Sequence, residues 1–100
     1  MNEPTRQEID ASPLPTVLEF GAQWCGYCQA AQADIAQVMK RHAGVRHIKV
    51  EDGRGKPLGR SFRVKLWPTL VYMDNGVEVG RVVRPNSADE IEAIFGKDRS

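Results

Sequence analysis

The sequence predicts an α/β domain in which a mixed β-sheet carries helices on both faces. Short apolar strand-like segments alternate with helix-like segments, and Asp74-Asn75-Gly76 is a strong hairpin signal between the last two strands. Alternating strands and helices indicate parallel pairing and a hairpin indicates antiparallel pairing, so the predicted sheet is mixed. At 100 residues the chain fits a single domain with one modest core.

The predicted order is strand, helix, strand, helix, strand, strand, helix. β-Branched and aromatic residues predict strands at 16–20, 45–50, 69–73 and 77–83. An Ala- and Gln-rich segment with apolar residues at helical spacing predicts a long helix at 26–42, and a short helical turn should precede Phe62. Ser87 and Glu90 form a capping box that opens the last helix. Residues 1–13 are expected to be a polar, partly flexible lead, and residues 97–100 a tail.

The overall charge does not favour a nucleic-acid or membrane partner. Lys and Arg number 14 against 13 Asp and Glu, a formal net charge of +1, so no global field attracts polyanions. Positive charge is nevertheless concentrated in the middle of the chain, at Lys49, Arg54, Lys56, Arg60, Arg63 and Lys65. We expect either a solvated surface or an electrostatic docking face for a partner.

The start of the chain lacks the apolar stretch of a secretory signal, and no later run approaches transmembrane length. The sequence as written therefore predicts a cytoplasmic protein. We also expect a monomer.

Both cysteines of the chain lie in Trp24-Cys25-Gly26-Tyr27-Cys28. Two cysteines are too few for a disulfide scaffold, so the pair indicates redox or metal chemistry. Cys25 falls at a predicted helix start, where unpaired N–H groups favour a thiolate, and Gly26 leaves those groups unobstructed. We expect Cys25 to attack a substrate disulfide and Cys28 to resolve the resulting mixed disulfide.

A zinc site is the competing interpretation of this pair. Cys25, Cys28, His42 and His47 have the spacing of a two-Cys, two-His site. If residues 26–42 form one helix, however, His42 lies on the order of 20 Å from Cys28, at about 1.5 Å per residue. We therefore predict no metal, with His42 at a helix C-terminus and His47 in a strand.

Three segments resemble the thioredoxin family: Leu18-Glu19-Phe20, the cysteine motif with the preceding Ala22-Gln23, and Trp67-Pro68-Thr69-Leu70. The resemblance spans about residues 16–95 and implies the thioredoxin fold, with a shortened N-terminal part. It also implies a cis peptide bond before Pro68, facing the cysteines, and a backbone at Trp67 that is free to pair with substrate. Glu19 matches the buried acid that accepts a proton from the second cysteine, with a pKa raised by burial, and Lys49 matches its partner. A solvated Glu19 at a sheet edge is the alternative.

Other residues would form the substrate groove. The expected set is Trp24, Gly26, Tyr27, Trp67, Pro68, Thr69 and Arg84. Tyr27 replaces a proline common in thioredoxins and makes the motif similar to that of periplasmic disulfide isomerases. Arg84 replaces a glycine, which predicts a narrower set of partners, such as those presenting an acidic segment.

The resemblance implies a protein-disulfide reductase with no tightly bound cofactor, recycled by an NADPH-dependent thioredoxin reductase. A disulfide oxidase or isomerase, or a non-catalytic interaction module with this fold, remains an alternative. Glutaredoxin-like glutathione binding is not expected, because Arg84-Pro85-Asn86 stands where that family has paired glycines.

Overall fold

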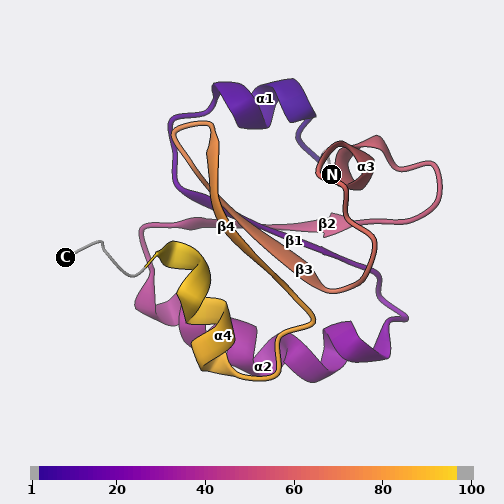
Figure 1. The fold of residues 1–100 in the computed structure, drawn as a ribbon, viewed down its shortest axis with the longest axis vertical. Helices are drawn as coiled ribbons and strands as arrows, with labels where there is room; N and C mark the ends of the chain where they lie inside the picture. Colours follow the sequence, from indigo (N-terminus) through magenta and orange to yellow (C-terminus); the bar gives the residue numbers. More distant parts are fainter. Residues whose placement is uncertain (1–2, 97–100) are drawn as a thin grey trace.

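The computed structural model describes residues 3–96 and contains a four-stranded sheet with helices packed against it (Figure 1). The strands are β1 (Thr16–Gly21), β2 (Arg46–Glu51), β3 (Thr69–Asp74) and β4 (Val77–Val83). The helices are α1 (Arg6–Ala11), α2 (Gly26–Arg41), α3 (Pro57–Ser61) and α4 (Ala88–Glu92), and the 3-10 turn η1 (Ala93–Phe95) follows α4. The tail predicted at 97–100 lies outside the described residues.

The sheet is mixed, as predicted. Its strand order is β2-β1-β3-β4, with β1 parallel to β2 and antiparallel to β3, and with β3 and β4 joined as an antiparallel hairpin. Asn75 and Gly76 both have positive φ in the turn between them, the conformation that such short hairpin turns require. The central strands β1 and β3 are buried along nearly their whole length.

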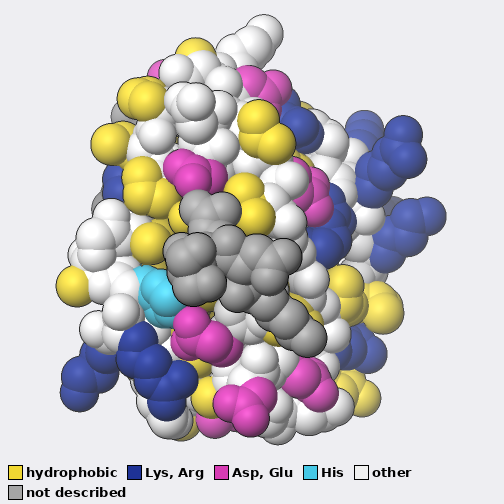
Figure 2. Space-filling model, turned by 60° about the vertical axis from the view of Figure 1, so that its left-hand side comes forward, with side chains coloured by type: hydrophobic (Ala, Val, Ile, Leu, Met, Phe, Trp, Pro, Cys, Tyr) yellow, Lys and Arg dark blue, Asp and Glu magenta, His cyan; other side chains and the backbone are white. Residues whose placement is uncertain are grey.

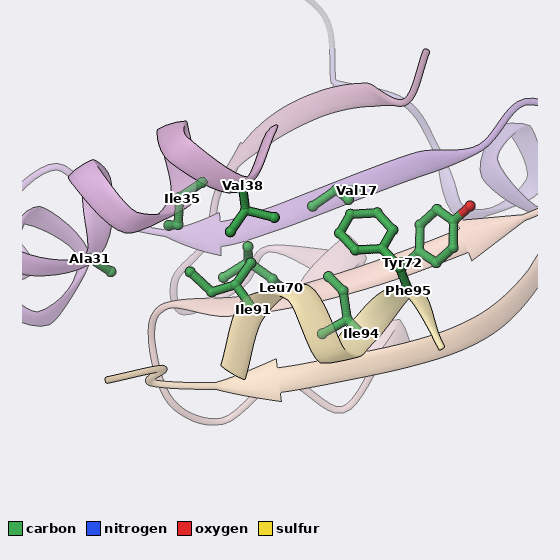
Figure 3. Packing of buried hydrophobic residues seen from close by; sticks show 9 residues of the cluster. All are labelled: Val17, Ala31, Ile35, Val38, Leu70, Tyr72, Ile91, Ile94 and Phe95. Atoms are coloured by element: carbon green, nitrogen blue, oxygen red, sulfur yellow. The ribbon is translucent and has the colours of Figure 1, made fainter. Parts of the chain in front are cut away.

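Each face of the sheet has its own apolar core. Val17, Leu70 and Tyr72 point to the face covered by α2, α4 and η1, and Figure 3 shows them packed against side chains from those helices. Leu18 and Val71, one position away, point to the face covered by α1 and α3. This alternation follows the two-residue period of a strand, and it places helices on both sides of the sheet (Figure 1).

Helix α1 was not predicted, and it lies within the expected polar lead. Thr5 and Glu8 form a capping box around its first turn, with Glu8 N donating to Thr5 Oγ1 at 3.1 Å and Thr5 N donating to Glu8 Oε1 at 2.8 Å. Ile9 buries the inner side of the helix against the sheet. Arg6 ties it to α3, because its Nη1 donates to the Ser61 carbonyl at 2.7 Å.

The remaining elements begin and end within a residue or two of their predicted bounds. Ser87 caps α4 by accepting from Glu90 N, although the Glu90 carboxylate accepts from Asn86 N rather than from Ser87 N. Within residues 3–96, no helix is long and apolar enough to span a membrane.

Candidate active site

The two cysteines lie at the start of α2, as free thiols. Cys25 is the N-cap residue of the helix, and its Sγ accepts the Cys28 N–H at 3.2 Å. This N–H is one of the donors that the first turn of a helix leaves unpaired. The sulfur of Cys25 therefore occupies the position where a helix stabilises a negative charge, as the sequence predicted.

The thiol of Cys28 has a raised pKa. Burial raises its pKa from 9.0 to about 11, and the hydrogen bond and charge of Cys25 and the charge of Glu19 act in the same direction, against a lowering hydrogen bond from the Ala22 backbone. Cys28 thus carries its proton at neutral pH and needs an acceptor before it can attack. Gly21 packs directly on it, since a Cβ added at Gly21 would lie 2.8 Å from the Cys28 sulfur.

The structure does not require glycine at position 26 for steric reasons, although the sequence suggested that it would. A Cβ added there would meet no atom within 4 Å, so steric room for the sulfur does not require glycine at this position.

The loop before β3 supplies the other wall of the site. The Trp67–Pro68 peptide bond is cis, as the resemblance implied, and Pro68 is fully buried. Cys25 Sγ lies 3.9 Å from the Trp67 carbonyl oxygen, and Trp67 packs on the small cluster of Ala22, Cys25 and Cys28. Thr69 is buried and donates to the Leu66 carbonyl at 2.6 Å, so its side chain supports the loop instead of lining the groove.

Arg84 binds this loop through the Trp67 carbonyl, which the sequence analysis expected to be free. Its Nε donates to the Trp67 carbonyl at 2.9 Å, and its backbone N–H donates to the Pro68 carbonyl at 2.8 Å. The Trp67 carbonyl, expected to be free for a substrate strand, is therefore already an acceptor for Arg84.

Aromatic side chains form the rim of the site. Trp24 is 75% exposed and meets Trp67 edge to face at 5.4 Å, while the Arg84 guanidinium lies over the Tyr27 ring at 3.9 Å. Trp67 is itself held by Asp52, whose carboxylate accepts from the indole Nε1 at 2.9 Å. Trp24, Tyr27, Trp67 and Arg84 thus surround the cysteine pair, as the sequence predicted.

Glu19 is buried, as predicted, but its direct partners differ from the expected one. One carboxylate oxygen lies 2.6 Å from His47 Nε2, and the other accepts from Gln32 Nε2 at 2.8 Å. Lys49 is adjacent in the β1–β2 register, yet its ammonium donates to Gln32 Oε1 at 2.9 Å. The predicted Glu19–Lys49 pair is therefore wrong as a direct contact, and Gln32 joins the two residues.

These partners also reverse the expected pKa shift. Burial is the largest single influence and raises the pKa of Glu19, but the hydrogen bonds from His47 and Gln32, with the charges of His47 and Lys49, together outweigh it. The pKa of Glu19 is consequently lowered from its ordinary value of 4.5, and the carboxylate is ionised at neutral pH.

An open pocket of about 880 Å³ connects the buried acid with the second cysteine. Glu19, Cys28, Gln32 and Lys49 all line it. Gln32 also donates to the Cys28 carbonyl at 3.0 Å, so one amide touches both Glu19 and the cysteine motif. The pocket gives solvent a route between the Cys28 thiol and the Glu19 carboxylate.

The geometry required for the zinc alternative is missing. Helix α2 is continuous from Gly26 to Arg41, which places His42 at the opposite end from the cysteines, where it pairs with Glu92. His47 is in β2 and pairs with Glu19. Among residues 3–96, no group of three His, Cys, Asp or Glu side chains could hold a metal ion.

Sequence reasoning missed Gln32, His47 and Asp52 as parts of this site. For two of them, the spacing along the sequence indicates a position near the site. Gln32 lies four residues after Cys28 on the same face of the helix, and His47 lies two residues before Lys49 on the same face of the strand. Nothing near Asp52 in the sequence indicated its bond to Trp67.

A cysteine pair at a helix start, beside a cis-proline loop on a mixed sheet, defines a dithiol protein of the thioredoxin fold. The family model for thioredoxin matches residues 2–97. The structure of thioredoxin 2 from Pseudomonas aeruginosa PAO1 in its reduced form is 55% identical, with a TM-score of 0.82, covering 93% of this chain and 86% of that one. The chain belongs to the thioredoxin family.

Curated relatives of the chain are also thioredoxins. Thioredoxin C-3 of Corynebacterium nephridii is 35% identical over 74 residues, which cover 74% of this chain and 51% of that protein. Thioredoxin H2-1 of Oryza sativa subsp. japonica is 33% identical over 84 residues, which cover 84% of this chain and 60% of that protein. The chain thus spans between half and two thirds of the length of these two relatives.

Proposed function

We propose that this protein is a thiol–disulfide oxidoreductase that reduces disulfides in partner proteins. The observation that carries the proposal is the position of Cys25, whose sulfur accepts the Cys28 N–H at 3.2 Å at the start of α2. A helix start stabilises the thiolate, which is the attacking form of cysteine. The cis Trp67–Pro68 loop lies against the same cysteines, with Cys25 Sγ 3.9 Å from the Trp67 carbonyl oxygen.

The proposed cycle uses both cysteines. The Cys25 thiolate attacks one sulfur of the substrate disulfide, a mixed disulfide forms, and the other substrate sulfur leaves and takes a proton. Cys28 then gives its proton to an acceptor and attacks Cys25 Sγ, so that the Cys25–Cys28 disulfide forms and the second substrate sulfur leaves as a thiolate and takes a proton from water. In total, two electrons pass from the cysteine pair to the substrate, and the protons are exchanged through the acceptor and solvent.

Glu19 is the proposed acceptor of the Cys28 proton, through water in the shared pocket. Because the Cys28 pKa is about 11 and the Glu19 pKa is low, transfer to Glu19 is uphill. His47 Nε2 lies 2.6 Å from the same carboxylate and helps to hold it in place beside the pocket.

The proposal includes the supply of electrons. Family membership supports an NADPH-dependent thioredoxin reductase as the source, with no cofactor tightly bound to the chain itself. We further propose that the protein works as a monomer in the cytoplasm.

The reduction potential of the cysteine pair tests the direction of electron flow. The protein is equilibrated with glutathione buffers of set poise, and the oxidised fraction is measured. A value near about −270 mV supports a cytoplasmic reductase, whereas a value of about −120 to −180 mV favours an oxidase or isomerase. A pair that forms no disulfide would contradict the proposal and leave the fold as a non-catalytic interaction module.

Cysteine variants test the roles within the cycle. With a disulfide-containing protein as substrate, Cys28→Ser should accumulate the mixed disulfide on Cys25, because no resolving thiol remains. Cys25→Ser should form none and lose turnover. Equal trapping by both variants would contradict the assigned roles.

A further inference from the structure

Positive charge is concentrated beside Trp67, at the edge of the site. On one side, a surface pocket of about 420 Å³ is lined by Trp67 together with Arg54, Lys56, Arg60, Arg63 and Lys65. We call these five cations the basic patch. The one acid that also lines this pocket, Asp52, is bound to the Trp67 indole.

The side chains of the basic patch are free of ion pairs with other described residues. All five side chains are exposed, and within residues 3–96 none of them makes an ion pair or a side-chain hydrogen bond. Elsewhere in the same part of the chain, Arg6, Arg41 and Arg81 each pair with an acid. The near-zero formal charge is therefore unevenly distributed. On the face shown in Figure 2, Lys and Arg side chains gather at the margins, whereas acidic ones are spread across it.

Arg84 places a further cation against Trp67, at a second pocket that it lines together with Tyr27 and Asp34. Its Nε is used by the Trp67 carbonyl and its flat face rests on Tyr27, which together fix the guanidinium. Its two terminal nitrogens have no hydrogen-bond partner among the described residues. A fixed guanidinium with an open edge has the geometry that binds a carboxylate with two hydrogen bonds.

Backbone conformation provides an independent observation. Arg63 and Arg84 adopt positive φ angles of 59° and 49°, a region that costs a non-glycine residue on the order of 1 kcal/mol. Glycine would relieve this cost at both positions. The backbone conformation therefore favours arginine at neither place. The Arg84 side chain holds the Trp67 carbonyl, and the Arg63 side chain makes no ion pair or side-chain hydrogen bond within residues 3–96.

We propose that Arg84 and the basic patch select substrates whose disulfide is flanked by acidic residues on both sides. The inference rests on the proposed function and specifies its substrate class. A segment lying across the cysteine pair would present acids to Arg84 on one side and to the basic patch beyond Trp67 on the other. Electrostatic complementarity of this kind raises association rates by about 10-fold or more at low salt.

The test uses two synthetic peptides that differ only in charge. Each has one intramolecular disulfide, flanked on both sides by glutamates in one peptide and by glutamines in the other. The reduced full-length protein should reduce the acidic peptide about 10-fold faster at low ionic strength, and the preference should largely disappear at about 1 M salt, where the Debye length is about 3 Å.

Variants locate the source of the preference. Arg84→Gly and Arg63→Gly should each lower the acidic-to-neutral rate ratio several-fold, and the double variant should bring it close to one; glycine suits the backbone at both sites. Lys40→Gln is the matched control, since it removes one charge from the last turn of α2, about 18 Å along the helix from Cys28. It should leave the ratio unchanged.

A binding measurement separates this inference from the proposed function. Both tryptophans of the chain, Trp24 and Trp67, lie at the site, so their fluorescence should report binding of peptides in which serines replace the cysteines. If the acidic peptide binds more tightly but neither disulfide peptide is reduced, the proposed reductase activity is refuted and the proposed selection of acidic substrates is supported. Equal binding and equal rates for both peptides would overturn the inference, as would a preference that survives the double variant or falls equally in Lys40→Gln.

Discussion

Gly21 shows how the absence of a side chain shapes the site. The residue ends β1, and the Cys28 sulfur occupies the space that a Cβ would take. Gly21→Ala should displace the Cys28 sulfur and destabilise the protein by about 1–3 kcal/mol, the usual cost of overpacking. Urea denaturation of the reduced protein measures the stability, and the decay of a trapped mixed disulfide measures the slower resolving step.

Gly26→Ala is the matched comparison for stability. The new methyl group would meet no atom within 4 Å, and alanine is the better helix former by up to about 1 kcal/mol. Its free energy of unfolding should be equal to or higher than that of the wild type. If both variants lost the same stability, crowding against Cys28 would not be the cause.

Glu19 links the site to acid stability. Its pKa is lower in the folded protein than its ordinary value of 4.5, so folding favours the ionised form. This contribution is fully present above about pH 4.5 and is lost as the pH falls through the lower folded value. The stability of the wild type relative to Glu19→Gln should therefore decline as the pH falls below about 4.5, which urea denaturation at each pH would show.

The difference between the two proteins is the informative quantity, because Glu78 also has a lowered pKa, through its hydrogen bonds with Arg81, and adds its own acid dependence to both. A difference that stays constant across this range would mean that Glu19 is not held in its charged form by the fold. His47→Ala should move the Glu19 pKa upward, since burial would then act with less opposition. Carboxyl NMR signals would report that shift directly.

At the scale of elements, one end of α2 carries the cysteine pair and the other end packs against α4 and η1. The N-terminal end holds Cys25 and Cys28, and the C-terminal end is anchored to α4 and η1 by His42. The His42 ring stacks on Phe95 with centroids 3.9 Å apart, and its Nε2 lies 2.6 Å from a Glu92 carboxylate oxygen. This anchor fixes the direction of the helix and thereby the position of the cysteines at its other end.

His42→Ala should cost about 1–3 kcal/mol, because the stacking contact is lost and the Glu92 carboxylate loses a close partner. Urea denaturation measures the loss. Lys40→Gln, two residues away on the exposed side of the same turn, should stay within about 0.5 kcal/mol of the wild type. Comparable losses in the two variants would point to a general weakness of the helix end.

At the scale of the whole molecule, one sheet is shared by two cores. Ile91 of α4 belongs to the core on one face, and Ile9 of α1 belongs to the core on the other. Because β1 and β3 contribute to both, neither core can be lost without exposing strands that the other requires.

Ile91→Val and Ile9→Val make the same chemical change on opposite faces. Each should lower the free energy of unfolding by about 0.5–1.5 kcal/mol while unfolding remains a single transition. Far-UV circular dichroism and tryptophan fluorescence, followed against urea, should give coincident curves for both variants. Separate transitions in Ile9→Val alone would show that α1 and its core unfold independently.

Local patterns in the sequence were sufficient for the order of the elements, the mixed sheet and the placement of Cys25 at a helix start, and the resemblance to the thioredoxin family implied the cis bond before Pro68. Each depends on residues close together in the chain, or on a motif with fixed spacing. Helix α1 also has a local signal, because Thr5 and Glu8 have the spacing of a capping box.

Only the tertiary structure decided which distant side chains meet. Glu19 and Lys49 are neighbours in the β1–β2 register, but the carboxylate reaches His47, two residues along the same strand face, while the longer Lys49 side chain reaches Gln32. Arg84 likewise turns its Nε to the Trp67 carbonyl. Such choices depend on side-chain length, rotamer and packing between elements far apart in the chain, so spacing along the sequence could indicate a neighbourhood and could not determine the bonds within it.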